Sequence, residues 1–217
     1  MYMVDTNNPN PVTLSLDNSL TSNNVNRAEA LTSGLIKVGS LASGETAEIT
    51  LSRSSSNSSV VKYITGNGNE QAVPLTAQDL ATLGNGTISV SVVKKDAAGN
   101  TSTTTSNTFA LDTLAPSSPM LSLATGISDG ATNAEAKSAT GVVNLLSEFG
   151  SNISVVLSKT GVTSINKSFT STGSNIAVVL SDSELTSLGT GEVTLSAIAT
   201  DSSGNTSLSS LINFNVI

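Results

Sequence analysis

An internal repeat is the feature that most constrains what this chain can fold into. The segment Leu80–Phe109 aligns without a gap with Leu185–Phe214, and 11 of the 30 aligned positions are identical. The pattern Asp-Thr-x-x-Pro occurs at Asp5–Pro9 and again at Asp112–Pro116. Repetition at a fixed period indicates that one structural unit occurs twice. We place the two domains at residues 4–111 and 112–217.

Alternation of apolar and polar residues predicts short β-strands within each unit. In Ile88–Val92 and Val193–Ala197 every second residue is apolar, so the apolar side chains share one face of a strand. The sequence Asp-x-x-Gly-Asn follows soon after both segments and predicts a hairpin turn. Further strands are expected at Val12–Leu16, Leu35–Leu41, Ala47–Arg53, Val60–Thr65 and Gln71–Leu75, and at Met120–Leu123, Gly141–Leu146, Ile153–Lys159, Ile165–Thr170 and Asn175–Leu180.

About seven short strands in each unit predict an all-β fold, namely two tandem immunoglobulin-like β-sandwich domains arranged end to end. The disulfide and the core tryptophan that are common in such domains are absent, because the chain has no Cys and no Trp. We expect Phe109 and Phe214 to help fill the two cores. Short N-capped helical turns are expected at Thr76–Leu80 and Ser181–Leu185, ending at glycine.

The composition excludes several classes of function. Without Cys or His, the chain lacks thiol nucleophiles, imidazole bases and the usual zinc ligands, so we expect no enzyme. The net charge of −7 argues against binding to nucleic acid or to anionic membranes, which are contacted through Lys and Arg. The longest apolar runs, such as Ile176–Leu180, are far shorter than the ~20 residues that cross a membrane, so no membrane insertion is expected.

The repeated motifs resemble those of a family of bacterial surface proteins. Asp-x-x-Gly-Asn-x-Ser at Asp96–Ser102 is followed by Phe-x-Leu-Asp-Thr-x-Ala-Pro at Phe109–Pro116. A polar loop that closes on Ala-Glu-Ala lies at Leu16–Ala30 and again at Leu123–Ala136. This arrangement resembles the bacterial Ig-like (BIg) tandem repeats of large RTX and biofilm-associated surface adhesins. The first unit departs from the pattern with Asn-Asn-Pro where x-Ala-Pro is expected.

The resemblance implies a structural extender that is exported to the bacterial cell surface and projects an adhesive region for attachment or biofilm formation. Its partners would be neighbouring Ig-like repeats of the same chain, and any host or matrix ligand would bind elsewhere in the adhesin. We expect a monomer. The resemblance also implies that Ca2+ at the junctions between domains stiffens the array.

The acidic residues allow a calcium prediction from their own positions. Ca2+ takes roughly 6–8 oxygen ligands from carboxylates, amides and backbone carbonyls. In a head-to-tail pair of such sandwiches, the loop after the first strand of domain one faces the start of domain two. The candidate ligands of this junction are Asp17, Asn24, Asn26 and Glu29 from the loop, together with Asp112 and Asp201. Two half-sites are expected, one with Asp5 and Asp96 and one with Asp129 and Glu135.

Four of these acids also have an interpretation without metal. Asp96 and Asp201 stand where an aspartate caps the backbone N–H groups of a turn. Glu29 and Glu135 are equally consistent with solvated residues in a short helical turn. At a further recurring pair, Asp79 and Glu184, stabilisation of a helix N-terminus is favoured over metal binding.

A second function remains open alongside the extender. A ligand-binding adhesin module would recognise a host or matrix glycan or protein through a loop that departs from the repeat. The best candidate is Arg53–Ser59, which is more polar than its counterpart Lys159–Thr163.

Overall fold

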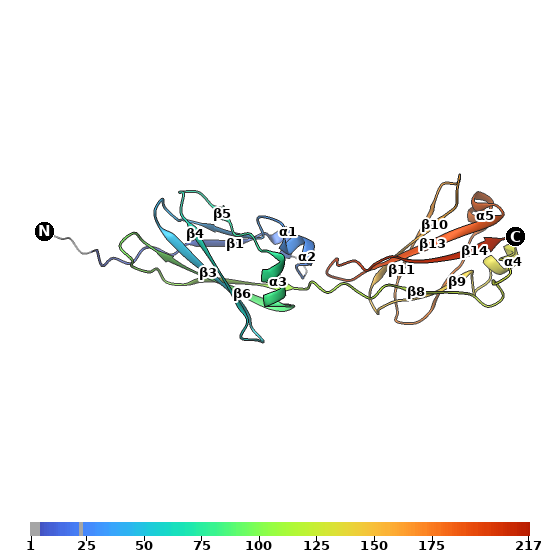
Figure 1. Ribbon diagram of the computed structural model, residues 1–217, viewed down its shortest axis with the longest axis horizontal. Coiled ribbons are helices and arrows are strands. Elements are labelled where there is room, and N and C mark those ends of the chain that lie inside the picture. Colours follow the sequence, from blue (N-terminus) through green and yellow to red (C-terminus); the bar gives the residue numbers. More distant parts are fainter. Residues whose placement is uncertain (1–4, 22–23) are drawn as a thin grey trace. The chain divides into compact units, whose positions relative to one another are not determined.

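The computed structural model describes residues 5–21 and 24–217, and it divides the chain into two compact units. Unit 1 ends at Leu114 and unit 2 begins at Ala115 (Figure 1). Each unit is a β-sandwich, as the strand pattern predicts. The contacts assign Asp112–Leu114 to unit 1, three residues beyond the boundary expected from the repeat, because these residues continue to bind unit 1 after its last strand.

Unit 1 contains a three-stranded sheet in the order β1-β2-β5 and a four-stranded sheet in the order β4-β3-β6-β7. All neighbouring strands within these sheets are antiparallel. Outside the sheets, Val25 forms an isolated parallel bridge with Leu111. The elements are β1 (Thr13–Leu16), α1 (Asn18–Thr21), α2 (Arg27–Ala30), β2 (Ile36–Gly39), β3 (Thr46–Arg53), β4 (Ser59–Thr65), β5 (Gln71–Ala72), α3 (Ala77–Leu83), β6 (Gly86–Lys95) and β7 (Thr105–Leu111).

Unit 2 repeats this topology with sheets in the orders β12-β9-β8 and β11-β10-β13-β14. Ala131 forms a parallel bridge with Val216, as Val25 does with Leu111. The elements are β8 (Met120–Leu123), α4 (Asn133–Ala136), β9 (Val143–Leu146), β10 (Asn152–Ser158), β11 (Ile165–Thr170), β12 (Ile176–Val178), α5 (Asp182–Leu188), β13 (Gly191–Thr200) and β14 (Ser210–Val216).

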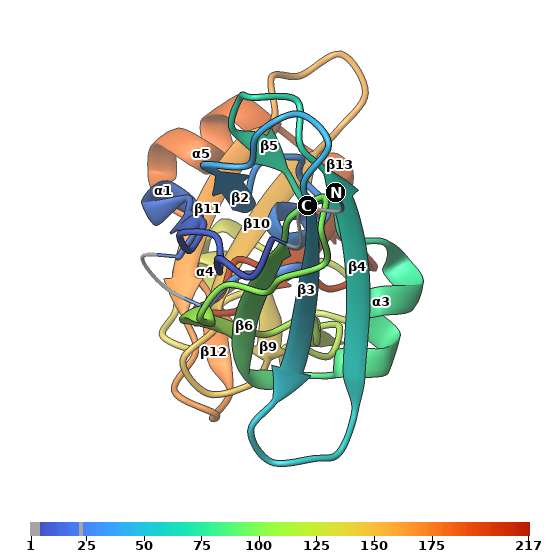
Figure 2. The same cartoon turned by 90° about the vertical axis from the view of Figure 1, so that its left-hand side faces the viewer.

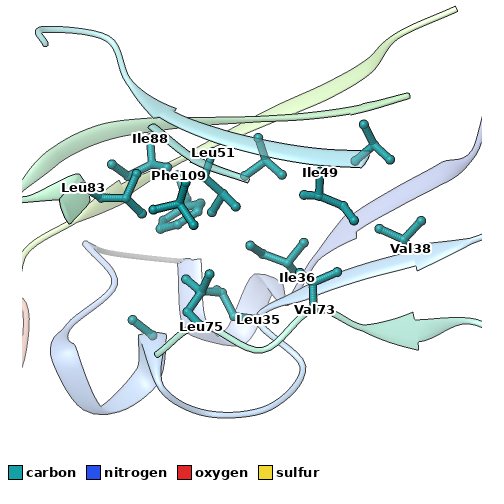
Figure 3. Close-up of a cluster of buried hydrophobic side chains, with 14 of the residues drawn as sticks. Leu35, Ile36, Val38, Ile49, Leu51, Val73, Leu75, Leu83, Ile88 and Phe109 are labelled. Atoms are coloured by element: carbon teal, nitrogen blue, oxygen red, sulfur yellow. The ribbon is translucent and has the colours of Figure 1, made fainter. Parts of the chain in front are cut away.

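The core of unit 1 lies between its two sheets. Alternation along β3 and β6 turns Ile49, Leu51 and Ile88 inward, where they meet Ile36 and Val38 of β2 (Figure 3). The side chain of Phe109 lies in the same cluster, as predicted, and Phe214 is buried in the core of unit 2. Each unit therefore has a hydrophobic core of its own.

Helix α3 closes one side of the sandwich in unit 1, and helix α5 does the same in unit 2. Figure 2 shows α3 beside β4 at the margin of the four-stranded sheet. Leu80 and Leu83 on the inner face of α3 are buried in the core of unit 1, and the helix ends at Gly84, whose φ is 65°. Glycine adopts this positive φ without the strain that a Cβ would cause.

The strand at Gln71 is shorter than the sequence pattern predicts. The pattern indicates Gln71–Leu75, but β5 stops at Ala72, two residues before Pro74. Proline has no N–H for a sheet ladder, so paired strand structure does not continue through it. Val73 and Leu75 still turn into the core although they lie outside a strand.

Candidate functional site

The two Asp-x-x-Gly-Asn segments form the same hydrogen-bonded turn. In unit 1 the Asp96 Oδ1 accepts from the backbone N–H groups of Ala98 (2.9 Å) and Asn100 (2.8 Å). The Asn100 side chain donates to Asp96 Oδ2 at 3.0 Å. The hydrogen bond from Asn100 and those from backbone N–H groups outweigh desolvation and lower the pKa of Asp96. A carboxylate at this position therefore stabilises the turn without a metal ion.

Asp201 repeats these contacts in unit 2. Its Oδ1 accepts from the N–H groups of Ser203 and Asn205, each at 2.8 Å, and its Oδ2 accepts from the Asn205 side chain at 3.0 Å. The turn reading of both aspartates is confirmed. Their role as calcium ligands remains a prediction, because a carboxylate that caps a turn can also bind a cation.

The N-terminal end of unit 1 brings Asp5 next to the Asp96 turn. The Asn100 side chain donates to the backbone carbonyl of Asp5 at 3.2 Å, so one asparagine contacts both residues of the predicted half-site. The Asp5 side chain accepts from the N–H of Asn7 at 3.0 Å. The neighbourhood that the repeat predicts for these two residues is therefore present.

The acidic side chains of the loop after β1 accept hydrogen bonds from residues of the same loop. Asp17 Oδ1 accepts from the N–H (2.9 Å) and the hydroxyl (2.6 Å) of Ser19 at the start of α1. The hydroxyl bond is the largest cause that lowers the pKa of Asp17. Asn26 and Glu29 form a capping box on α2, in which Asn26 Oδ1 accepts from the N–H of Glu29 (3.0 Å) and Glu29 Oε2 from the N–H of Asn26 (2.9 Å). Glu29 therefore has a definite structural role.

The same capping box occurs in unit 2. Thr132 replaces Asn26 as the N-cap of α4, and its hydroxyl and N–H donate to Glu135 Oε2 at 2.7 and 2.9 Å. These two bonds lower the pKa of Glu135. Asp129 lies in the turn just before, where the N–H of Gly130 donates to the carbonyl of Ile127. Glu135 is thus a helix-capping residue, and Asp129 lies six positions before it in the sequence.

The loop after β1 lies against the chain where it leaves unit 1. The Asp112 N–H donates to the carbonyl of Val25 at 2.9 Å, which places the backbone of Asn24–Asn26 beside Asp112. Asp112 Oδ1 accepts from the side chain of Asn85 at 2.8 Å and from the N–H of Leu114 at 3.1 Å. Four candidate ligands (Asn24, Asn26, Glu29 and Asp112) therefore gather at one end of unit 1, while the contribution of Asp201 remains a prediction.

Capping-box acids also anchor the longer helices. Asp79 caps α3 and forms a 2.6 Å ion pair with Lys62 of β4, and Glu184 caps α5 and forms a 2.6 Å ion pair with Lys167 of β11. Burial raises the pKa of Asp79 and of Glu184, but the hydrogen bonds from the lysine and the N-cap residue outweigh it and hold both pKa values below their ordinary range. The preference for helix stabilisation over metal binding is consistent with these contacts.

Calcium binding by one unit alone would depend mainly on neutral oxygens. Within residues 5–21 and 24–217, no three acidic side chains gather in a group that could hold a metal ion. Ca2+ takes roughly 6–8 oxygens, so a site at the end of unit 1 would combine Asp112 with amide and backbone oxygens of the 24–26 segment. These residue types suit a hard cation, although the acidic donors of one unit do not complete a site.

In the part of the chain that the structure describes, the carboxylates with lowered pKa serve turns and helix caps. None of its buried side-chain nitrogen or oxygen atoms lacks a hydrogen-bond partner. None of its helices is long and apolar enough to span a membrane.

Comparison with known proteins finds matches among solved structures only. No protein-family model and no curated protein matches the sequence. Among solved structures, the chain is similar to a tetra-tandem repeat from the extending region of a large adhesion protein (19% identity, TM-score 0.38, covering 95% of this chain and 49% of that one). It is also similar to a bacterial ice-binding adhesin (17% identity, TM-score 0.41, 97% and 66% covered). A two-domain fibronectin type III segment of chicken tenascin matches with 12% identity and a TM-score of 0.34, over 96% of this chain and 99% of that one.

Residues that the sequence pattern does not predict also contact the predicted acids. Asn85 donates a hydrogen bond to Asp112, which lies 27 residues later in the sequence. Lys62 donates to Asp79, which lies 17 residues later. Such contacts depend on the fold and leave no local pattern. The capping boxes did leave a signal, because Asn26-x-x-Glu29 and Thr132-x-x-Glu135 have the spacing of that motif.

Proposed function

We propose that this chain is a two-domain spacer segment of a large bacterial cell-surface adhesin of the RTX or biofilm-associated type. It acts outside the cell, holds adhesive regions away from the surface, and performs no catalysis. The proposal is supported by the tandem repeat, by the motif resemblance over nearly the whole chain, and by the two separate cores.

The observation that carries the proposal is the path of the chain through unit 1. Asp5 lies beside the turn that follows the end of β6, whereas Asp112 lies beside Asn85, which precedes β6. The chain therefore enters at one end of this ten-residue strand and leaves at the other, about 30 Å away. A domain crossed from end to end adds its length to an array, which is what a spacer requires.

Contacts at both ends of unit 1 suit a chain under tension. Val25 pairs in parallel with Leu111, and β1 contacts β7, with the Thr105 hydroxyl donating to the carbonyl of Val12 at 3.2 Å. Both strands run away from the N-terminal end of the unit. Pulling on the two ends of the unit would therefore load several interactions together.

Rigidification by Ca2+ is a further part of the proposal. The ligands would come from Asn24, Asn26, Glu29 and Asp112 at the end of unit 1, with Asp17 and Asp201 as further candidates. The support is chemical, since carboxylate, amide and carbonyl oxygens are the donors that Ca2+ prefers. Bound ions would offset repulsion in a chain of net charge −7.

No observation favours the alternative of ligand binding through Arg53–Ser59. This loop is stabilised by its own contacts, in which Arg53 Nε and the Ser58 N–H both donate to Ser56 Oγ at 3.2 Å. Arg53 also donates to the carbonyl of Asn85 at 3.2 Å, so it supports a neighbouring turn. The loop is thus explained as a structural connection between β3 and β4.

A replacement experiment in the full-length adhesin distinguishes the spacer function from ligand binding. Exchanging residues 5–217 for two unrelated immunoglobulin-like domains of equal length should preserve attachment of cells to their target surface, because a spacer supplies only length. Deleting the segment should weaken attachment. Loss of attachment after the exchange, with normal display of the protein on the cell, would refute the spacer role and favour ligand binding.

A further inference from the structure

The side chain of Asn85 binds the segment by which the chain leaves unit 1. Asn85 stands between α3 and β6, and its Nδ2 donates to Asp112 Oδ1 at 2.8 Å. Its Oδ1 accepts from the N–H of Thr113 at 2.9 Å and from the hydroxyl of Thr113 at 2.8 Å. Both ends of one amide group are therefore used on residues that follow the last strand.

The backbone around Asn85 holds this side chain in place. The Asn85 carbonyl accepts from Arg53 Nη1 at 3.2 Å. The flanking residues Gly84 and Gly86 have φ values of 65° and 129°, which shape the turn between helix and strand. A fixed turn thus presents the amide to the exit segment, Asp112–Leu114. Little entropy is therefore lost when the hydrogen bonds of the amide form.

The exit segment forms further hydrogen bonds, both to the rest of unit 1 and within itself. The Asp112 N–H donates to the carbonyl of Val25, and Asp112 Oδ1 accepts from the N–H of Leu114. Asp112 and Thr113 are half-buried, whereas Leu114 is exposed. With Asn85, these bonds extend the ordered structure of unit 1 beyond Leu111, where β7 ends.

Unit 2 provides an internal comparison. The repeat aligns Thr190 with Asn85, so the amide is absent there, whereas Lys159 replaces Arg53 and donates to the Thr190 carbonyl. The sandwich and its helix α5 form all the same. The bidentate contact of Asn85 is therefore not required by the fold, and its specific effect falls on residues 112–114.

We infer that Asn85 is a positioning residue that fixes Asp112–Leu114 on unit 1, so that the chain can change direction between the units only from Ala115 onward. The purpose of such a contact rests on the proposed spacer function, because a shorter flexible linker between units keeps a row of such units extended. The contact itself and its test do not depend on that function.

Backbone dynamics of the two-unit chain test the inference. In the unaltered protein, the amides of Thr113 and Leu114 should have order parameters close to those of β7, about 0.85, and the Thr113 amide should exchange slowly with solvent. In Asn85→Ala, both order parameters should fall below about 0.6 and the protection of Thr113 should be lost, while β6 and β7 stay unchanged.

Asn107→Ala is the matched control. Asn107 is an exposed asparagine of β7 whose side chain accepts from the N–H of the adjacent Thr108, so its removal should leave residues 112–114 ordered. Mobile Thr113 and Leu114 amides in the unaltered protein would overturn the inference even if Asn85→Ala failed to fold. Unchanged amides in a folded Asn85→Ala variant would overturn it as well. Neither result bears on attachment, so the spacer function is judged separately.

Discussion

Single carboxylates fix the turns and helix ends of both units. Asp96 and Asp201 cap equivalent turns, and four capping boxes use Glu29, Asp79, Glu135 or Glu184. Recurrence between the two units shows that these acids belong to the repeated fold. Their recurrence alone therefore does not identify metal ligands.

Asp201→Ala should destabilise unit 2. The substitution removes three hydrogen bonds to a half-buried charged acceptor, so we expect a loss of about 1–2 kcal/mol in the free energy of unfolding. Urea unfolding monitored by circular dichroism measures it. Ser202→Ala changes an exposed residue of the same turn and should have almost no effect. Equal stability of the two variants would show that the aspartate is not needed for the turn.

The ion pair between Lys167 and Glu184 should make unit 2 sensitive to acid. The pKa of Glu184 lies below its ordinary value of 4.5, so the folded state gains stability above pH 4.5 and loses it as the pH falls through the lowered pKa. The substitution Lys167→Met removes the ion pair, so the stability gained above pH 4.5 becomes smaller. The difference in unfolding free energy between the unaltered protein and the variant should therefore be larger at pH 7 than at pH 3. A difference that is the same at both pH values would contradict this origin.

At the scale of elements, the period-2 alternation predicted most strands because it reflects burial on one face of a sheet. Val193, Leu195 and Ala197 are buried as the pattern requires, and Phe109 lies in the core. The end of β5 was missed because the pattern counts apolar residues, whereas Pro74 breaks the backbone pairing. Asn85 was missed because its partners lie 27 and 28 residues away and its counterpart in unit 2 is threonine.

The separate cores predict that damage in one unit stays there. Leu157→Ala removes a fully buried side chain between the sheets of unit 2 and should cost about 2–5 kcal/mol. Leu208→Ala, at a residue that is 82% exposed, should change stability by less than about 0.5 kcal/mol. Amide exchange should show unit 2 opening more often in Leu157→Ala, with unit 1 unchanged. Faster exchange in both units would mean that they do not fold separately.

At the scale of the whole molecule, calcium should stabilise the chain if it binds where the sequence predicts. A ligand that binds only the folded state at 100 times its dissociation constant adds about 2.7 kcal/mol, so excess Ca2+ should raise the melting temperature relative to chelator. Asp112→Asn and Asp201→Asn should each reduce this increase, and Glu192→Gln, an exposed acid outside the predicted site, should not. An unaltered melting temperature with and without Ca2+ would remove calcium from the proposal.

The central claim is that the chain consists of two independent units that can bear load in series, with unit 1 crossed from end to end. Stretching a single molecule by its two termini tests this claim most directly. We predict two separate unfolding events, each lengthening the tether by roughly 300 Å as about 100 residues are released. A single event that releases the whole chain, or extension without any force peak, would contradict the account.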